Sequence, residues 1–296
     1  MAKPGVHPAT AYLFVAPCAL VFAVFTVWPM LFNGWLAFQD YFIASRNTAW
    51  NDFANFLVLA DSQAFQIALR NSMLLLLLTV PLIQGGALGL ALLVHRPLPG
   101  ITFFRATYYL PVVITVSIAG IVWQYVFHHE GILNWLLGLV GLMEPGEGVP
   151  WLERGGWSLV AVMAFCFWKY VGYYMVLYLV GLASVPRELQ EAAMLDGAGT
   201  WARFRHVTWP LLAPVAVLCT LLSTIGALKT FQEVLVLTGG EGDTMTPLLF
   251  VYRTAFSGFN FGVAGAASLM FTLVCLLVAA LQMRLMGRHN PFTRSE

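Results

Sequence analysis

The sequence predicts an all-α membrane protein with six transmembrane helices and both termini in the cytoplasm. Of its 296 residues, 59% are hydrophobic and only 10% are charged, and the mean hydropathy is +0.78. Soluble domains carry about 25% charged residues, so most of this chain is expected to lie in lipid. Transmembrane β-strands would show about ten residues of alternating polarity, and the apolar runs here do not alternate. The spans are therefore expected to be helices.

Six apolar stretches are each long enough to cross a bilayer. A hydrocarbon core of about 30 Å needs roughly 20 mostly apolar helical residues. The first stretch exceeds the apolar core of roughly 7–15 residues found in a signal peptide, which favours a retained span over a cleaved leader. Residues 1–296 are thus expected to form one transmembrane domain, with spans at about 12–38, 72–94, 107–127, 157–183, 209–237 and 261–284.

The positions of lysine and arginine near the span ends predict the orientation, because basic residues concentrate in cytoplasmic segments. With a cytoplasmic N-terminus, nine such residues lie inside: Lys3, Arg96, Arg105, Arg187, Arg203, Arg205, Arg284, Arg288 and Arg294. Four lie in the outside loops 39–71, 128–156 and 238–260: Arg46, Arg70, Arg154 and Arg253. This bias places the loops 95–106 and 184–208 in the cytoplasm.

The inside loop 184–208 carries the most specific pattern in the chain. Pro186 suits the first turn of a helix, where its missing N–H costs nothing. A short amphipathic helix is expected over residues 187–195. One of its faces holds three apolar residues at i, i+3 and i+4: Leu189, Ala192 and Ala193.

The second half of this loop predicts a sharp corner and another short helical turn. Asp196 and Gly197 are expected to end the first helix, because glycine tolerates the left-handed conformation at a helix end. Thr200 can cap a second turn that presents Trp201 and Phe204 together. Small side chains along the corner would let another backbone approach closely. From this pattern alone, the loop either docks a partner or rests on lipid headgroups.

The same loop resembles the "EAA" loop of the inner-membrane permeases of binding-protein-dependent ABC importers. The family pattern is Glu-Ala-Ala-x-x-Asp-Gly-Ala, followed by Phe, an aliphatic residue and Leu-Pro. Its counterparts here are Glu191, Ala192, Ala193, Asp196, Gly197, Ala198, Phe204, Val207 and Pro210. Trp209 stands where Leu is usual, a conservative change for an apolar contact. The resemblance implies the fold of a type I ABC-importer permease, with these residues docking into a groove of an ATPase subunit.

Weaker resemblances follow in the right order along most of the chain and favour permeases of the carbohydrate-uptake type. They lie at Leu13–Met30, Leu69–Ser72, Trp123–Asn134, Lys229–Gln232, Leu237–Gly240 and Ala255–Ala266. Gln232 and Glu241 depart from the Asp and Pro usual there, which puts the substrate role of that aspartate in doubt. The expected solute is a sugar, a polyol or a sugar phosphate, with a non-sugar solute as the alternative.

The chain shows no ATPase motif. A phosphate-binding loop needs G-x-x-x-x-G-K-[ST], and none of its lysines, Lys3, Lys169 and Lys229, follows a glycine. No cofactor is therefore expected on this chain, and ATP-Mg would bind separate subunits. His128-His129-Glu130 is a weak metal pattern, because adjacent histidines point to different sides of a helix, and a solvated loop is favoured.

The resemblance also implies partners. These are a second, homologous permease forming a heterodimer, two ATP-binding subunits and an extracytoplasmic solute-binding protein. Membrane lipid surrounds the spans, and no basic run suggests nucleic acid.

Charged residues inside the predicted spans mark a possible substrate pathway, because a charge in the bilayer is costly. Lys169 lies near the middle of span four. Lys229 and Glu233 are four residues apart in predicted span five and could pair on one helical face. Polar and aromatic neighbours are Phe231, Gln232, Trp168, Tyr170, Tyr173 and Tyr174. The alternative is a structural polar network that holds the helices together.

Two other classes of membrane protein predict different features in the sequence. An ion-gradient-driven secondary transporter predicts inverted repeats and titratable residues at the midplane, and the chain shows neither a repeat nor Asp or His in the middle of a span. A membrane-embedded enzyme would need a His/Asp/Glu constellation within the spans. Both are therefore less favoured than an ABC importer permease.

Overall fold

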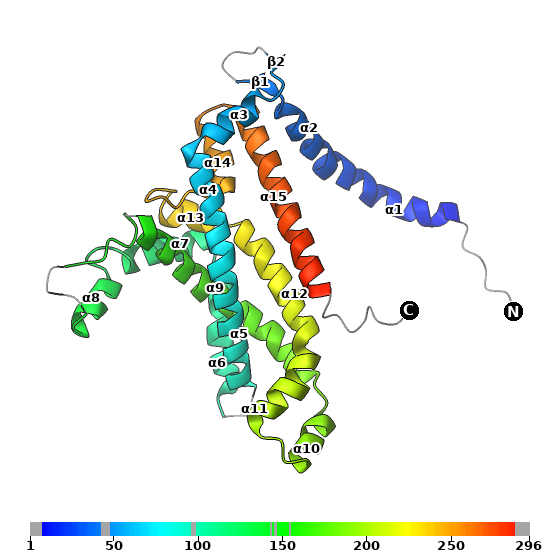
Figure 1. The fold of residues 1–296 in the computed structure, drawn as a ribbon, viewed down its shortest axis with the longest axis vertical. Helices are drawn as coiled ribbons and strands as arrows, with labels where there is room; N and C mark the ends of the chain where they lie inside the picture. Colours follow the sequence, from blue (N-terminus) through cyan, green and yellow to red (C-terminus); the bar gives the residue numbers. More distant parts are fainter. Residues whose placement is uncertain are drawn as a thin grey trace. The chain divides into compact units, whose positions relative to one another are not determined.

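The computed structural model describes residues 8–42, 48–95, 99–142, 144, 147–153 and 155–287, and this part of the chain is mostly helical (Figure 1). Contacts divide the chain into two compact units, Met1–Phe65 with Phe250–Leu273 and Gln66–Leu249 with Val274–Glu296. The expectation of one transmembrane domain stays a prediction. Several basic residues used to predict the orientation lie outside the described residues: Lys3, Arg46, Arg96, Arg154, Arg288 and Arg294.

The first unit combines a long apolar helical segment with a small hairpin. Its elements are α1 (Pro8–Phe22), the π-turn η1 (Ala23–Val27), α2 (Trp28–Leu36), β1 (Gln39–Tyr41), β2 (Thr48–Trp50), α3 (Ala54–Asp61), η4 (Arg253–Ser257) and the first part of α15 (Phe261–Gly287). The first predicted span falls on α1, η1 and α2, and its side chains are exposed from Tyr12 to Phe32. A helix that is apolar all round suits lipid or a partner helix.

The hairpin of this unit is fixed by one buried amide. β1 and β2 pair antiparallel, with Gln39 opposite Trp50. The Asn55 Nδ2 donates to both Ala37 O and Gln39 O at 2.9 Å. Gly262 at the start of α15 lies against the same strand, and a Cβ there would come within 2.2 Å of Gln39 O. Only glycine permits this close approach.

The second unit is built around the long helix α9 (Gly155–Ala183). Its other elements are most of α4 (Gln63–Leu74), η2 (Leu75–Thr79), α5 (Val80–Val94), α6 (Ile101–Val113), α7 (Val116–Val126), α8 (Ile132–Leu139), α10 (Arg187–Leu195), α11 (Thr200–Arg203), η3 (Phe204–Thr208), α12 (Trp209–Leu228), α13 (Gln232–Leu237) and the start of α14 (Pro247–Tyr252). Helix α9 packs against α5, α6 and α12 (Figure 1). Gly172 allows the contact with α6, because a Cβ there would lie 1.8 Å from Tyr108 O.

Within the described residues, five helices are long and apolar enough to cross a membrane, and a bent pair makes six if it is one span. The five are Tyr12–Leu36, Gln63–Val94, Gly156–Ala183, Thr200–Leu228 and Phe261–Leu285. They correspond to all the predicted spans except the third. The helices extend beyond several predicted limits because their polar ends continue the same backbone hydrogen bonding.

The third predicted span, 107–127, is wrong as a continuous helix. Helices α6 and α7 meet at a break and are bent by 101°. Ile114 has an extended backbone there, with φ −70° and ψ 134°. Pro111 lacks an N–H for the helix, and a run of β-branched residues follows it over 112–116, which weakens helix formation. The Lys169 Nζ compensates, because it donates to Ile114 O at 2.6 Å and Pro111 O at 3.0 Å.

The fifth predicted span is also too long at its C-terminal end. Helix α12 ends at Leu228, and α13 begins only at Gln232. Phe231 between them has a non-helical backbone, with φ −138° and ψ −59°. Lys229 and Glu233 therefore do not share a helical face as predicted. Glu233 instead lies in the first turn of α13, where the helix dipole favours a negative charge.

Buried amides also fix the connections that follow α13 and α7. The Asn71 Nδ2 donates to Met245 O at 3.0 Å and to Asp243 O, which fixes the turn after α13. The Asn134 Nδ2 donates to His129 O at 2.9 Å, and its Oδ1 accepts from Trp151 Nε1 at 2.8 Å. The segment 128–130 is an exposed turn, in agreement with the favoured interpretation of its histidines. In the described chain, no group of three His, Cys, Asp or Glu is placed to hold a metal ion.

Candidate solute pocket and docking loop

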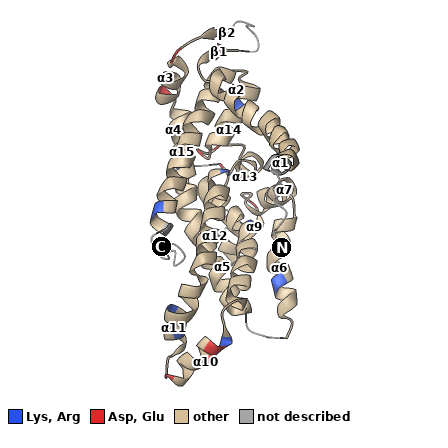
Figure 2. Cartoon of the chain, turned by 90° about the vertical axis from the view of Figure 1, so that its right-hand side faces the viewer, with Lys and Arg blue, Asp and Glu red and all other residues tan. Residues whose placement is uncertain are grey.

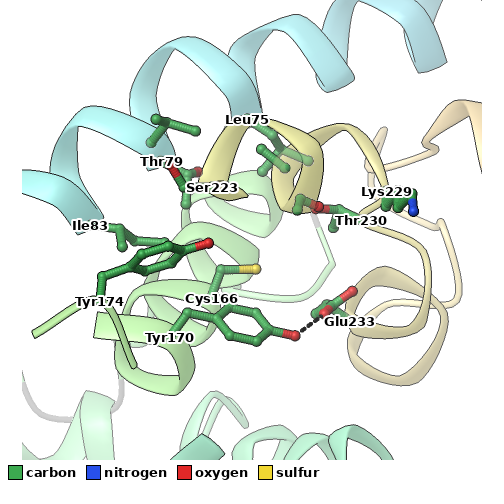
Figure 3. A pocket seen from close by; sticks show the side chains of 13 residues that line it. Leu75, Thr79, Ile83, Cys166, Tyr170, Tyr174, Ser223, Lys229, Thr230 and Glu233 are labelled. Atoms are coloured by element: carbon green, nitrogen blue, oxygen red, sulfur yellow. Dashed lines mark hydrogen bonds between the residues drawn. The ribbon is translucent and has the colours of Figure 1, made fainter. Parts of the chain in front are cut away.

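A cavity of about 230 Å³ lies among the central helices of the second unit (Figure 3). Its walls come from η2, α5, α9, α12 and α13, together with the break after α12. The lining residues are Leu75, Thr79, Val80, Ile83, Cys166, Tyr170, Tyr174, Ser223, Gly226, Ala227, Lys229, Thr230 and Glu233. Aromatic rings, hydroxyl groups and one carboxylate thus face a single space, which suits a ligand with many hydroxyl groups and an apolar ring face.

The carboxylate of this pocket is buried and paired with a tyrosine. The Tyr170 Oη on α9 donates to Glu233 Oε1 on α13 at 2.5 Å, and the Glu233 residue is only 8% exposed. An ionised carboxylate has about four lone-pair sites, so this bond leaves acceptor positions open. Figure 3 shows the Lys229 amine pointing away from the Tyr170–Glu233 bond. The pair can therefore accept hydrogen bonds from hydroxyl groups of a bound molecule.

Two hydroxyl groups on the other wall differ in their partners. The Ser223 Oγ accepts from Gln84 Nε2 at 2.9 Å and donates to Thr220 O at 3.1 Å. The Thr79 Oγ1 is buried and has no hydrogen-bond partner among the described residues. Buried polar groups normally have a partner, so an orphaned one needs an explanation. Thr79 ends the π-helical segment η2, and such segments inside α-helices are frequent at functional sites.

The structure sorts the residues predicted for the substrate pathway into two groups. Lys229 and Glu233 line the pocket, although Lys229 is exposed. Lys169 is 3% exposed and holds the break between α6 and α7 through its two carbonyl bonds. Phe231 packs on a hydrophobic cluster around Phe165 and Val234, and Gln232 is exposed. The geometry of Lys169 thus fits the structural polar network that was its alternative interpretation.

Sequence reasoning missed Thr79 and Ser223 as pocket residues. Each is a small hydroxyl residue in an apolar span, a common feature that carries no distinguishing pattern. The signal that could have found Thr79 is its place two residues before Pro81, because a proline disturbs the preceding helical turn. Tyr170 and Tyr174, by contrast, were named as neighbours of Lys169, and both line the pocket.

The loop 184–208 has the two short helices and the sharp corner that its sequence predicts. Helix α10 begins at Arg187 and ends at Leu195 as expected. Gly197 has φ +79°, the left-handed conformation that glycine favours. The Trp201 and Phe204 rings stack, with centroids 5.6 Å apart and 28° between their planes.

Two details of this loop differ from prediction. Pro186 precedes α10 at its cap position, with φ −59° and ψ 132°, and is not in the first turn. Thr200 is the first residue of α11, and Gly199 occupies the cap. A glycine in an extended conformation fills a cap position at little cost. Pro210 lies in the first turn of α12, where its missing N–H needs no partner.

The first six residues of the EAA pattern lie in and just after α10, at the corner between the two short helices. Phe204 and Val207 follow in η3, and Pro210 lies in α12. Glu191, Ala192 and Ala193 are in α10, and the turn that follows contains Asp196, Gly197 and Ala198. Figure 2 shows charged residues on α10 and α11, in contrast to the uncharged ribbons of α5 and α12. Large apolar side chains are exposed beside them: Leu195 is 90%, Trp201 69% and Met194 50% exposed. An exposed surface with both charged and apolar groups is typical of an interaction site.

Comparison with known proteins identifies the family. Residues 98–294 match the family described as the binding-protein-dependent transport system inner membrane component, and the chain belongs to it. The lactose transport system permease protein LacF of Rhizobium radiobacter is 30% identical over 282 residues, which are 93% of each chain. The sulfoquinovosyl glycerol transport system permease protein SmoG of Agrobacterium fabrum is 30% identical, over 93% of this chain and 89% of that protein.

A solved structure has the same fold. It is a chain of a bacterial ABC transporter involved in the import of the acidic polysaccharide alginate, with a TM-score of 0.82. The two chains are 23% identical, and the match covers 94% of this chain and 95% of the other. The family, inferred from the EAA loop in the sequence, is confirmed. This chain is a multi-pass inner-membrane permease subunit of a binding-protein-dependent importer.

Proposed function

We propose that this chain is the membrane-spanning permease of an ATP-driven importer that translocates a carbohydrate delivered by an extracytoplasmic binding protein. The main observation that supports this proposal is the exposed loop 184–208, in which α10 and the corner after it present the EAA residues outward. Relatives named for lactose, sulfoquinovosyl glycerol and trehalose transport support a carbohydrate as the solute. The aromatic and hydroxyl lining of the pocket supports it independently.

In this proposal the energy comes from other chains. Two ATP-binding subunits carry ATP-Mg, and each docks on one permease. On this chain the docking site is the loop that contains Glu191. Two permeases, this chain and a homologous second one, together enclose the passage. ATP binding favours one of two states of the transporter, and the solute on its binding protein favours that state too. The docking loop, continuous with α9 and α12, transmits the change to the helices that line the pocket.

The pocket supplies the solute contacts in this scheme. Glu233 and Tyr170 accept hydrogen bonds from sugar hydroxyl groups, and the Thr79 hydroxyl gains a partner, which it lacks among the described residues. Tyr174 offers a ring face to the apolar side of a sugar. Lys169 has a structural role in this scheme, because its amine donates to two backbone carbonyls.

Co-purification tests the docking loop. The tagged chain is expressed with its ATP-binding subunits, and wild type is compared with Glu191→Arg. Reversal of this exposed charge should release the ATPase while the permease still inserts in the membrane. The matched control is Glu130→Arg, an equal charge reversal in the exposed turn 128–130, which should retain the ATPase. Retention of the ATPase by Glu191→Arg would exclude this loop as the coupling element.

Uptake assays test the solute class separately. Cells that carry the complete transporter should accumulate a labelled neutral sugar, and Glu233→Gln should weaken that uptake. Uptake of amino acids or peptides but not sugars would show that the solute is not a carbohydrate. Uptake that follows an ion gradient without ATP would assign the chain to a secondary transporter instead of an ATP-driven importer.

A further inference from the structure

A second and larger cavity, of about 700 Å³, lies between the docking loop and the helix ends that carry it. Its walls come from α5, α9, α10, α11 and η3, with the residues next to α5 and α9. The lining residues are Leu92, His95, Leu182, Val185, Arg187, Gln190, Thr200, Trp201, Arg203, Phe204 and Thr208. This set includes two arginines and a histidine, and no Asp or Glu among its described members. The cavity is thus suited to an anion.

One of the arginines lacks a partner for a buried donor. The Arg203 Nε is buried and has no hydrogen-bond partner within the described residues. A guanidinium is always charged, and a buried charged donor without an acceptor is costly. An acceptor from outside the chain removes this cost. The planar fork of arginine matches the oxygen geometry of a phosphate.

Other groups around the cavity also favour a negative charge. Arg187 is the first residue of the nine-residue helix α10, so the positive end of that helix dipole lies at the same wall. Gln190 is already engaged, because its Nε2 donates to Thr208 Oγ1 at 2.9 Å. That bond ties α10 to η3 and keeps the wall of the cavity in place. Arg187 and Arg203 are the arginines that this wall offers to a ligand.

The apolar part of the wall distinguishes between possible anions. Leu92, Leu182 and Val185 lie at or just beyond the ends of α5 and α9, and the stacked Trp201 and Phe204 rings complete the wall. A free phosphate ion would make no use of these side chains. A phospholipid combines a phosphate with an apolar body, and basic pockets between helices on the cytoplasmic side bind anionic headgroups.

We propose that this cavity binds the headgroup phosphate of an anionic phospholipid, held by Arg203 and Arg187. The inference rests on the proposed cytoplasmic position of loop 184–208, and it adds a regulatory site to the transport function. A bound headgroup bridges the ends of α5 and α9 to α10 and α11, so it restrains the docking loop relative to the spans. Coupling to the ATPase then depends on anionic lipid in the membrane.

Thermal unfolding of the purified full chain tests this site. The chain in a neutral detergent is titrated with phosphatidylglycerol, with phosphatidylcholine or with inorganic phosphate. Wild type should be stabilised by phosphatidylglycerol only. Arg187→Gln, which removes an exposed arginine, should weaken the apparent affinity for phosphatidylglycerol about tenfold, and Arg203→Gln should weaken it at least as much. Arg205→Gln is the matched control, because Arg205 is exposed and does not line the cavity.

Three outcomes would contradict the proposal. Equal stabilisation by inorganic phosphate would assign the cavity to a free anion. An unchanged response in Arg187→Gln and Arg203→Gln, or an equal loss in Arg205→Gln, would show unspecific attraction of charged lipid. If Arg203→Gln does not fold, Arg187→Gln and native mass spectrometry of lipid-bound wild type decide the question. ATPase co-purification is a separate measurement, so failure here leaves the proposed function standing.

Discussion

The central pocket and the docking loop belong to the same unit of the chain, but their side chains differ in burial and in contacts within the chain. In the pocket, Glu233 and Ser223 are buried and have partners on neighbouring helices. In the loop, Leu195 is 90% exposed and Trp201 69%. The pocket residues are explained mainly by contacts within the chain. The loop residues add little to the stability of the chain, so we expect a partner to contact them.

From this difference we expect mutations in the two regions to have different first effects. Substitutions among the buried contacts of α9 should first lower stability, and substitutions on α10 should first lower association with a partner. Each of the predictions below assigns one residue to one side of this division. A pocket variant that lowers only association, or a loop variant that lowers only stability, would contradict this division.

The largest effect on stability is expected at the contact of α9 with α6. In Gly172→Ala the new Cβ would lie 1.8 Å from the backbone oxygen of Tyr108, so the helices must move apart. Such overpacking costs about 1–3 kcal/mol, and the backbone obstacle places this case at the upper end. Thermal unfolding in detergent measures it. Gly89→Ala in α5 is the control, because a Cβ there has nothing within 4 Å. Equal melting temperatures of the two variants would contradict the packing described here.

The next effect is expected at the break between α6 and α7. Lys169→Met leaves Pro111 O and Ile114 O without their donor, which should cost about 1–3 kcal/mol of unfolding free energy. Lys229→Met, at an exposed residue, should change stability by less than about 0.5 kcal/mol. If Lys169→Met raises the KM for uptake and leaves the melting temperature unchanged, Lys169 belongs to the solute pathway instead.

The break between α6 and α7 also shows what the sequence alone could not predict. Helix α10 could be predicted to the residue because its signals are local: Pro186 before it and Asp196-Gly197 after it. The break in the third span depends on a donor 55 residues away from Ile114, the amine of Lys169. Such a contact leaves no periodic trace in the sequence. Apolar composition locates a span, but it does not show whether the helix is continuous.

The candidate pocket divides in the same way. Glu233 could be singled out because a carboxylate within an apolar run is rare. Its partner could not, because the predicted i, i+4 spacing pointed to Lys229, and the actual partner Tyr170 comes from another helix. The pairing follows from the end of α12 at Leu228, which only the folded chain reveals. Thr79 and Ser223 are likewise defined by the space that they face.

A smaller effect is expected from Tyr170→Phe, which removes only the hydrogen bond to Glu233. The loss should cost about 1 kcal/mol of stability, and a contribution of that size to solute binding would raise the KM for sugar uptake about fivefold. Tyr173→Phe is the matched control, because Tyr173 does not line the pocket. An unchanged KM together with a lower melting temperature would make the Tyr170–Glu233 bond purely structural.

The smallest effect on stability, with a clear effect on association, is expected from Leu195→Ser. Leu195 is 90% exposed at the end of α10, so its removal should change the free energy of unfolding by less than about 0.5 kcal/mol. The amount of ATPase that co-purifies should nevertheless fall, because the proposed docking gives this exposed leucine an apolar contact on the partner. Leu139→Ser on α8, at a leucine that is 68% exposed, should leave the ATPase bound. If Leu195→Ser lowers the melting temperature and retains the ATPase, the loop is stabilised by its own chain, and the distinction between pocket and loop does not hold.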